Sequence, residues 1–247
     1  MSKIALITGA SSGFGEATAR QLADKGWQLI LVARRIERLE ALKNDLGDGV
    51  LECICLDVRE REAVKHLLEP WNGKIDLLIN NAGLAAGLDM AWNASLDDWD
   101  VMVDTNIKGL TYVTRALLSG MVENGRGHVI NMGSIAGSYN YPGGNAYGAT
   151  KAFVERFSMN LRSDLQGTGV RVTNIEPGLA ETEFSEVRFK GDTKKAESLY
   201  QGIKALQPED IAQSIAWCAS LPEHVNINRL EIMPTVQSFG PLPIARD

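Results

Sequence analysis

Short, continuous runs of Val, Ile and Leu alternate with helical patterns along most of this chain. We expect buried strands at residues 3–8, 27–32, 50–56, 75–80, 128–132, 170–175 and 226–233. Strands that are apolar on both faces are typical of a parallel sheet with helices on both sides. Right-handed crossovers wind such a chain into a doubly wound Rossmann sheet. The sequence therefore predicts the α/β class, with a sheet of about seven strands.

The intervening helices are expected at residues 17–25, 36–46, 60–68, 96–123 and 146–166, and a last one begins at Pro208. Residues 179–205 break this rhythm because they are charged and weakly periodic. A loop of that length inside a compact domain is usually functional. We therefore predict one catalytic domain over residues 1–247, with a substrate lid at about 179–205.

The composition excludes several classes of function. A net charge of −6 disfavours a nucleic-acid interface, which needs a basic stripe. No apolar run reaches the ~18 residues of a transmembrane helix, and the N-terminus leads into a strand without a signal peptide. The three cysteines follow no metal-binding or disulfide spacing, so no metal site is expected. The default expectation is a cytoplasmic protein with reduced thiols.

A glycine-rich turn follows the first expected strand. It has the spacing Gly-x-x-x-Gly-x-Gly, it opens a helix, and it contains Gly9, Ser11, Ser12, Gly13, Phe14 and Gly15. Glycines permit the tight turn, and the helix N-terminus offers free N–H groups and a positive dipole end to a pyrophosphate. The turn therefore predicts a dinucleotide site, and a plain glycine-rich turn is the less favoured alternative.

The residues that end the second strand indicate which dinucleotide is bound. An acidic residue there bonds the ribose 2′-hydroxyl of NAD, whereas arginine accommodates the 2′-phosphate of NADP. This chain has Arg34 and Arg35, with no acidic residue before Glu37. Because a guanidinium makes bidentate bonds to phosphate, NADP is the predicted cofactor. The pattern does not rank the two arginines, and one of them could instead cover the adenine or lie in solvent.

Two further strand ends complete the expected nucleotide site. Asp57 and Val58 follow the third strand, where the carboxylate could accept a hydrogen bond from the adenine amino group. A helix-capping role for Asp57 is an equal alternative. Asn81, Ala82 and Gly83 follow the fourth strand, and such small residues let a ribose lie against the backbone. A plain loop would have the same composition.

Tyr147 and Lys151 lie four residues apart in an expected helix, so they share one of its faces. A cation beside a phenol favours the phenolate, so the pKa of the tyrosine should fall from its usual value near ~10. That arrangement makes a general acid/base from a tyrosine. Taken alone, the pair could also be a chance surface spacing.

Together these motifs resemble the short-chain dehydrogenase/reductase family along the whole chain. The resemblance rests on the glycine-rich turn, Asn80-Asn-Ala-Gly83, Asn106, Ser134, Tyr147-x-x-x-Lys151, and Pro177-Gly178 followed by Thr182. It implies an enzyme in which Tyr147 exchanges a proton with the substrate oxygen, while Lys151 lowers the pKa of that tyrosine and bonds the nicotinamide ribose. Ser134 would orient the carbonyl or alcohol, and Asn106 would hold a water that links Lys151 to solvent.

The same resemblance adds five residues to the cofactor site, namely Tyr147, Lys151, Pro177, Gly178 and Thr182. Taken singly, Ser134 could be a strand-end cap and Asn106 a satisfied core amide. Both readings become weak when all four catalytic residues are present in order.

The second half of the chain is similar to bacterial NADP-dependent 3-hydroxy acid dehydrogenases, through segments 141–145, 174–178, 184–192 and 224–228. That group oxidises the β-hydroxyl of serine or L-allo-threonine, and some members reduce malonic semialdehyde to 3-hydroxypropionate. A substrate carboxylate needs a cation or N–H donors. Arg188 and Lys190, in the expected lid, are the candidates, and solvated loop charges are an equal alternative.

The resemblance also implies a homotetramer that pairs the two long helices across subunits. The stripe Phe153, Phe157, Leu161 and Leu165 favours burial on the sheet over an interface. The tail after Pro234 is expected to pack on a neighbouring subunit.

Three functions remain open at this point. The favoured one is NADP-dependent oxidation or reduction of a small 3-hydroxy acid. The alternative keeps the fold and chemistry but acts on another small ketone or secondary alcohol. The least favoured is a non-catalytic NADP-sensing protein, which could lose Tyr147 or Lys151, and this chain keeps both.

Overall fold

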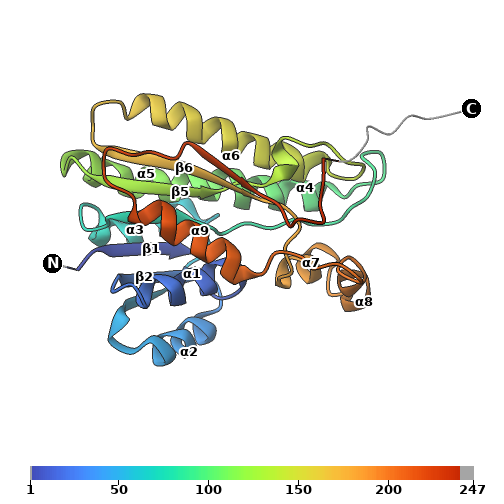
Figure 1. Cartoon of the computed structure of the whole chain (residues 1–247), viewed down its shortest axis with the longest axis horizontal. Helices are drawn as coiled ribbons and strands as arrows, with labels where there is room; N and C mark the ends of the chain where they lie inside the picture. The colour runs from blue at the N-terminus through green and yellow to red at the C-terminus, as the bar shows by residue number, and fades with distance from the viewer. Residues whose placement is uncertain (1, 240–247) are drawn as a thin grey trace, which may run out of the picture.

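The computed structural model describes residues 2–239, so the end of the tail expected to meet another subunit, residues 240–247, lies outside the described part. Seven parallel strands form one sheet in the order β3-β2-β1-β4-β5-β6-β7 (Figure 1). The predicted doubly wound Rossmann sheet is confirmed. The strands are β1 Ile4–Thr8, β2 Gln28–Ala33, β3 Val50–Cys55, β4 Leu77–Asn80, β5 Gly127–Met132, β6 Val170–Pro177 and β7 Arg229–Ile232.

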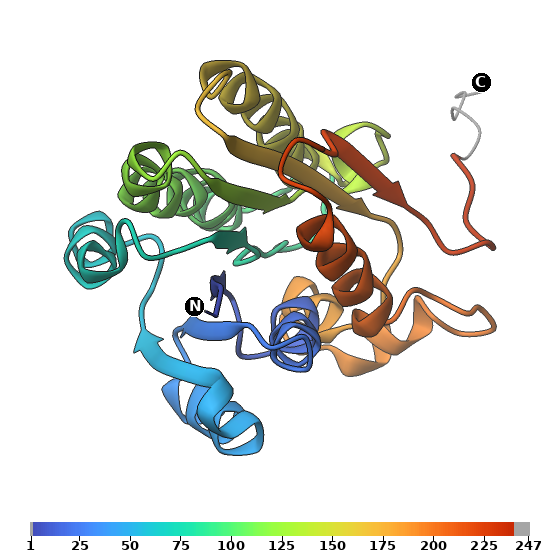
Figure 2. The same cartoon turned by 60° about the vertical axis from the view of Figure 1, so that its left-hand side comes forward.

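Helices cover both faces of the sheet (Figure 2). Side chains of α1, α2 and α9 pack in one core, and those of α3, α5 and α6 pack in the other. The helices are α1 Gly13–Ala23, α2 Ile36–Leu46, α3 Arg61–Leu68, α4 Leu96–Val103, α5 Leu110–Glu123, α6 Asn145–Asp164, α7 Glu183–Arg188, α8 Thr193–Ser198 and α9 Pro208–Ser220. Within residues 2–239, none of them has the length and apolar character to cross a membrane.

The central strands explain why the apolar runs are continuous. In β1, Ala5 and Ile7 belong to the core of α1, α2 and α9, whereas Leu6 belongs to the opposite core. All three side chains are fully buried, and burial of a Leu or Ile side chain contributes roughly 1.5–3 kcal/mol. The edge strand β3 departs from this pattern, because Leu51 and Cys55 are exposed there.

The helical region predicted over residues 96–123 is confirmed, but it is not α-helical throughout. A π-helical turn, Asp104–Gly109, separates α4 from α5. The turn contains Asn106, whose side chain bonds the backbone of Leu84 on a neighbouring loop. It also brings Gly109 against Val58, where a Cβ would lie 2.6 Å from Val58 Cγ2. These contacts come from outside the helix, so helical periodicity could not reveal them.

The irregular segment 179–205 contains two short helices, α7 and α8. They lie beyond the carboxyl ends of the strands (Figure 1). The hydroxyl of Tyr200 bonds the Ala180 carbonyl at 3.0 Å and the Ser185 hydroxyl, which ties the two ends of the segment together. The segment is thus a compact unit beyond the carboxyl ends of the strands, and its role as a lid stays a prediction.

Candidate active site

A cavity of about 660 Å³ opens at the carboxyl ends of the strands. Its walls come from the ends of β1 to β6, from α6 and from the segment that carries α7. β1 lies between β2 and β4, so the strand order reverses at this point. Ligands of open α/β sheets bind in the crevice at such a switch point.

The glycine-rich turn forms one end of the cavity. Gly9 and Gly13 have φ values of +66° and +54°, which favour glycine. A Cβ on Gly15 would lie 2.3 Å from the Gly9 carbonyl oxygen, so only glycine fits. The helix α1 begins at Gly13, and Ser11, Ser12, Gly13 and Phe14 line the cavity beside its free N–H groups. This close-packed cradle fits a pyrophosphate.

Asn81 supports this turn from behind. Its Nδ2 donates to the carbonyls of Thr8 and Gly9 at 3.0 and 3.2 Å. The Thr8 hydroxyl accepts the N–H groups of Asn81 and Ala82, both at 3.0 Å. Asn81, Ala82 and Gly83 also line the cavity. The role of Thr8 in joining β1 to the loop after β4 was missed, because the pairing depends on strand neighbours far apart in the sequence.

Arg34 and Arg35 both line the cavity beside the glycine-rich turn. Arg35 donates to the hydroxyls of Ser11 and Ser12, with its Nη2 at 3.0 and 2.8 Å. A third contact joins Arg35 Nη1 to a carboxylate oxygen of Glu183, at 3.1 Å. The structure therefore differentiates the two arginines, since Arg35 is held by three partners of the turn and of α7.

Asp57 forms a close ion pair that the sequence did not predict. Its carboxylate accepts from the guanidinium and the backbone N–H of Arg59, with Nη2 at 2.6 Å. The hydrogen bond from Arg59 holds the pKa of Asp57 below its usual value. The suggestion that Asp57 caps a helix is wrong, because α3 begins at Arg61 and its N-cap residue is Glu60. Asp57 and Val58 both line the cavity.

The end of β6 and the start of α7 form the opposite wall. Pro177 and Gly178 line the cavity, and the Gly178 N–H bonds the Ile232 carbonyl of β7 at 2.7 Å. Thr182 also lines it and caps α7, because its hydroxyl accepts the Phe184 N–H at 3.2 Å. The Thr182 side chain lies across from Gly13 of the glycine-rich turn, which brings the two ends of the expected cofactor site together.

The four residues predicted to act on the substrate come together. Ser134, Tyr147 and Lys151 line the cavity, and Lys151 Nζ lies 5.8 Å from the centre of the Tyr147 ring. The side chains of Asn106 and Lys151 both lie close to Gly83. A Cβ on Gly83 would lie 3.2 Å from Asn106 Oδ1 and 3.5 Å from Lys151 Nζ.

Asn106 is 2% exposed and its amide is fully bonded. Its Oδ1 accepts the Leu84 N–H at 2.9 Å, and its Nδ2 donates to the Leu84 carbonyl and the Thr150 hydroxyl at 2.8 and 3.0 Å. The side chain therefore fastens the loop after β4 to α6. A satisfied amide was one of the two interpretations of this residue, and the water-holding role stays a prediction.

The expected lowering of the pKa of Tyr147 is wrong for this structure. Burial raises the pKa of the phenol to about 12, against opposing effects of a hydrogen bond with Ser134 and of the Arg188 charge. Burial also lowers the pKa of Lys151 to about 8. The ammonium donates to the Met132 carbonyl at 2.8 Å, so Lys151 is oriented toward the backbone of β5. Desolvation is thus the largest influence on the pKa of both groups, and the four-residue spacing of the pair could not indicate it.

Of the two cations expected to meet a substrate carboxylate, only Arg188 lines the cavity. Its guanidinium lies 5.4 and 5.6 Å from the ring centres of Tyr141 and Tyr147, and its Nη2 donates to the Tyr141 hydroxyl at 2.7 Å. Lys190 is exposed and pairs with Asp98 at 2.9 Å, so its assignment to the substrate site is wrong. Arg188 lines the cavity and Lys190 lies on the surface, although a single residue separates them along the chain.

Tyr141 and Phe184 complete the wall around Arg188, and both were missed as site residues. The Phe184 ring centre lies 5.6 Å from that of Tyr147. Tyr141 begins one of the segments that carried the family resemblance, and that segment was the available signal. Phe184 had no signal beyond its place in the expected lid.

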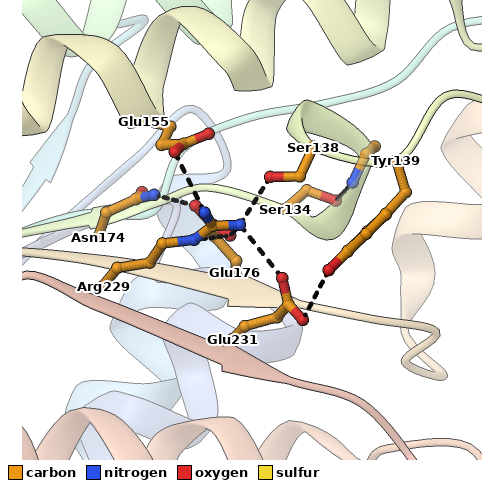
Figure 3. Close-up of polar contacts among 9 residues, drawn as sticks. Ser134, Ser138, Tyr139, Glu155, Asn174, Glu176, Arg229 and Glu231 are labelled. Atoms are coloured by element: carbon orange, nitrogen blue, oxygen red, sulfur yellow. Dashed lines mark hydrogen bonds and ion pairs between the residues drawn. The ribbon is translucent and has the colours of Figure 1, made fainter. Parts of the chain in front are cut away.

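A polar network centred on Arg229 supports the turn that carries Ser134 (Figure 3). Arg229 bonds the buried carboxylate of Glu176 at 2.6 Å and the Ser138 hydroxyl, also at 2.6 Å. Arg229 also pairs with the carboxylates of Glu155 in α6 and Glu231 in β7. The Glu231 carboxylate in turn accepts a hydrogen bond from the Tyr139 hydroxyl. Burial raises the pKa of Glu176 to about 7. The network joins β6, β7 and α6 to the turn after β5. Its members lie far apart in sequence, so only the tertiary structure shows it.

Comparison with known proteins agrees with this geometry. The profile of the short chain dehydrogenase family matches residues 3–193. The chain is 56% identical to the NADP-dependent 3-hydroxy acid dehydrogenase YdfG of Salmonella typhi, over 98% of this chain and 99% of that protein. It is 50% identical to sulfoacetaldehyde reductase 2 of Chromohalobacter salexigens, over 100% of both.

A solved structure is equally similar. The closed form of serine dehydrogenase complexed with NADP+ superposes with a TM-score of 0.96 at 55% identity, over 99% of this chain and 100% of that chain. The cavity of this chain lies where a doubly wound sheet binds its ligands, and Ser134, Tyr147 and Lys151 line it. This chain therefore belongs to the short-chain dehydrogenase family.

Proposed function

We propose that this protein transfers a hydride between NADP(H) and the 3-hydroxyl or 3-oxo carbon of a small 3-hydroxy acid such as serine, L-allo-threonine or 3-hydroxypropionate. The observation that carries this proposal is the guanidinium of Arg188, which lies 5.6 Å from the ring centre of Tyr147 inside the cavity. A cation at that distance from the proposed acid/base can hold a carboxylate while the neighbouring carbinol carbon reacts. The names of the relatives reported above support the same substrate class.

The residues of the cavity fit NADP. The glycine-rich turn would hold the pyrophosphate, Arg34 and Arg35 the 2′-phosphate, and Asp57 and Val58 the adenine side. The loop after β4, the Pro177–Gly178 corner and Thr182 would enclose the nicotinamide half. When bound, NADP supplies the hydride acceptor, and NADPH the hydride donor.

The protein's own groups handle the proton and the orientation of the substrate. Tyr147 would exchange a proton with the substrate oxygen, and Ser134 would bond that oxygen and set its direction. Lys151 would bond the nicotinamide ribose and stabilise the phenolate whenever its ammonium turns from Met132 toward Tyr147. Asn106 would support Lys151 from behind through the loop at Gly83. The walls formed by Tyr141 and Phe184 keep water from the reacting atoms.

Replacing Arg188 with alanine is expected to lower kcat/KM for serine by about 10²-fold, mostly through KM, because a charged hydrogen-bonding partner of the carboxylate is lost. Lys190→Ala is the matched control, since Lys190 is a neighbouring cation outside the cavity, and it should change kcat/KM less than about twofold. The measurement is steady-state NADP reduction. An Arg188→Ala enzyme with unchanged kcat/KM would remove Arg188 from the substrate site.

A substrate panel tests the proposed reaction directly. NADP reduction is measured with serine, L-allo-threonine and 3-hydroxypropionate, and with neutral secondary alcohols of similar size. NADPH oxidation is measured with malonic semialdehyde and with sulfoacetaldehyde. We expect the carboxylates to exceed neutral alcohols by at least about 10²-fold in kcat/KM, because only they engage Arg188. Equal rates with neutral alcohols would favour the alternative substrate class, and a preference for sulfoacetaldehyde would assign a sulfonate to the same cation.

We further propose that the protein is a homotetramer. Leu161 and Leu165 of the stripe on α6 are buried in the core, but Phe153 is 36% exposed and stacks on Phe157, with ring centres 5.7 Å apart. The neighbouring helix α5 exposes Val122. These exposed apolar side chains on the two long helices suit packing against another copy. Light scattering should give the mass of four chains, and a monomer at micromolar concentration would contradict the proposal.

A further inference from the structure

We propose that Glu183 of α7 acts as an internal competitor of the cofactor's 2′-phosphate, so that NADP must displace this carboxylate from the arginines to bind fully. The inference rests on the proposed use of NADP and goes beyond it. It assigns a specificity-determining role to a residue of the segment 179–205, which is far in sequence from the second strand.

The contacts of Glu183 carry the proposal. One carboxylate oxygen pairs with Arg35 Nη1 at 3.1 Å, and the other pairs with Nη1 of Arg38. Arg35 donates from Nε and Nη2 to the hydroxyls of Ser11 and Ser12 of the glycine-rich turn. Arg35 and Glu183 both line the cavity, so the ion pair lies on its wall and not on a remote surface. An anion of the protein therefore already pairs with Arg35 on the cavity wall, where the 2′-phosphate is proposed to bind.

A carboxylate and a phosphate use the same N–H groups of a guanidinium. Two anions a few Å apart at a partly buried site also repel each other. Burial raises the pKa of Glu183, but the hydrogen bonds from Arg38 and Arg35 outweigh it and hold the pKa below its usual value. Glu183 is thus ionised at neutral pH. The 2′-phosphate and this carboxylate cannot both have the full set of arginine contacts.

The position of Glu183 in α7 links this competition to the substrate site. Glu183 is the first residue of α7, and Arg188 is the last. One short helix thus presents an anion to the nucleotide end of the cavity and a cation to the end that contains Tyr147. Displacement of Glu183 by a phosphate would release the start of this helix. NAD has no 2′-phosphate, so it would leave the ion pair intact.

The test measures binding of two probes by isothermal titration calorimetry. Adenosine 2′,5′-bisphosphate carries the 2′-phosphate, and 5′-AMP does not. The variants are Glu183→Gln and, as a matched control on the same helix, Glu186→Gln, whose side chain is exposed. We expect Glu183→Gln to bind adenosine 2′,5′-bisphosphate about 5- to 20-fold more tightly than the unmodified protein, with 5′-AMP affinity unchanged within about twofold. The Glu186→Gln protein should match the unmodified one.

Amide hydrogen exchange gives a second measurement, which would not change with the probe if Glu183 had only a structural role. Adenosine 2′,5′-bisphosphate should speed amide exchange in α7 of the unmodified protein, and Glu183→Gln should show fast exchange without the probe. Unchanged or weaker binding by Glu183→Gln would overturn the competition, because Glu183 would then support the arginines. If neither protein prefers the 2′-phosphate probe over 5′-AMP, the proposed use of NADP fails as well.

Discussion

Replacing Tyr147 with phenylalanine should lower kcat for oxidation of a 3-hydroxy acid by about 10³-fold or more, while the affinity for NADP stays within about twofold. The variant removes one hydroxyl from a side chain that is 8% exposed and packs against Phe184. The ring remains, so the cavity keeps its shape. What is lost is the O–H that would exchange a proton with the substrate oxygen.

The control for this variant is Tyr112→Phe on α5. Tyr112 packs against the core shared by α3, α5 and α6 and lies outside the cavity, so loss of its hydroxyl should leave kcat within about twofold. Single-turnover measurements with saturating NADP separate chemistry from binding. Turnover of Tyr147→Phe within about tenfold of the unmodified enzyme would assign the proton transfer to another group, and the present account of the site would be wrong.

Replacing Arg34 and Arg35 together by glutamine should weaken NADP binding by about 10²- to 10⁴-fold, because each charged hydrogen bond to a phosphate contributes about 1.5–3 kcal/mol. NAD lacks the 2′-phosphate, so its affinity should fall less than about threefold. The measurement is Kd for both dinucleotides by calorimetry, followed by kcat/KM with each.

The single variants Arg34→Gln and Arg35→Gln show how much each arginine contributes to NADP affinity. Arg35→Gln also frees Glu183 from one of its two partners, and Arg34→Gln leaves that ion pair intact. A larger loss for Arg35→Gln would mean that Arg35 contributes more than Arg34 to binding of the 2′-phosphate. An equal loss of NADP and NAD affinity in the double variant would contradict the assignment of both arginines to the phosphate.

Much of the fold could be predicted because its signals are local. The run at residues 4–7 is apolar on both faces of the strand. A continuous apolar run of this kind predicts a strand that is covered by helices on both faces of a parallel sheet. What the local pattern could not predict is the π-turn inside the helical region 96–123, where a distant contact accompanies the local geometry. Asn106 bonds Leu84 from a different loop, and the helix opens into a π-turn around it. The exposed face of β3 follows from its place at the sheet edge, which the sequence does not state.

The site divides in the same way. Helical spacing predicted that Tyr147 and Lys151 share one face of a helix, the family resemblance added Ser134, and all three line one cavity. The protonation of these groups depended on burial, and the pKa of Tyr147 is raised where a fall was expected. Desolvation depends on all surrounding atoms and cannot be read from a spacing.

The sequence by itself determined the class of fold and the position of the glycine-rich turn, because periodicity and glycine spacing are properties of short segments. Only the tertiary structure decided which cation of the segment 179–205 lines the cavity, Arg188 rather than Lys190, and which anion pairs with Arg35. Arg35 and Glu183 are 148 residues apart in sequence, and only the packing of α7 against the ends of the strands brings their charges together.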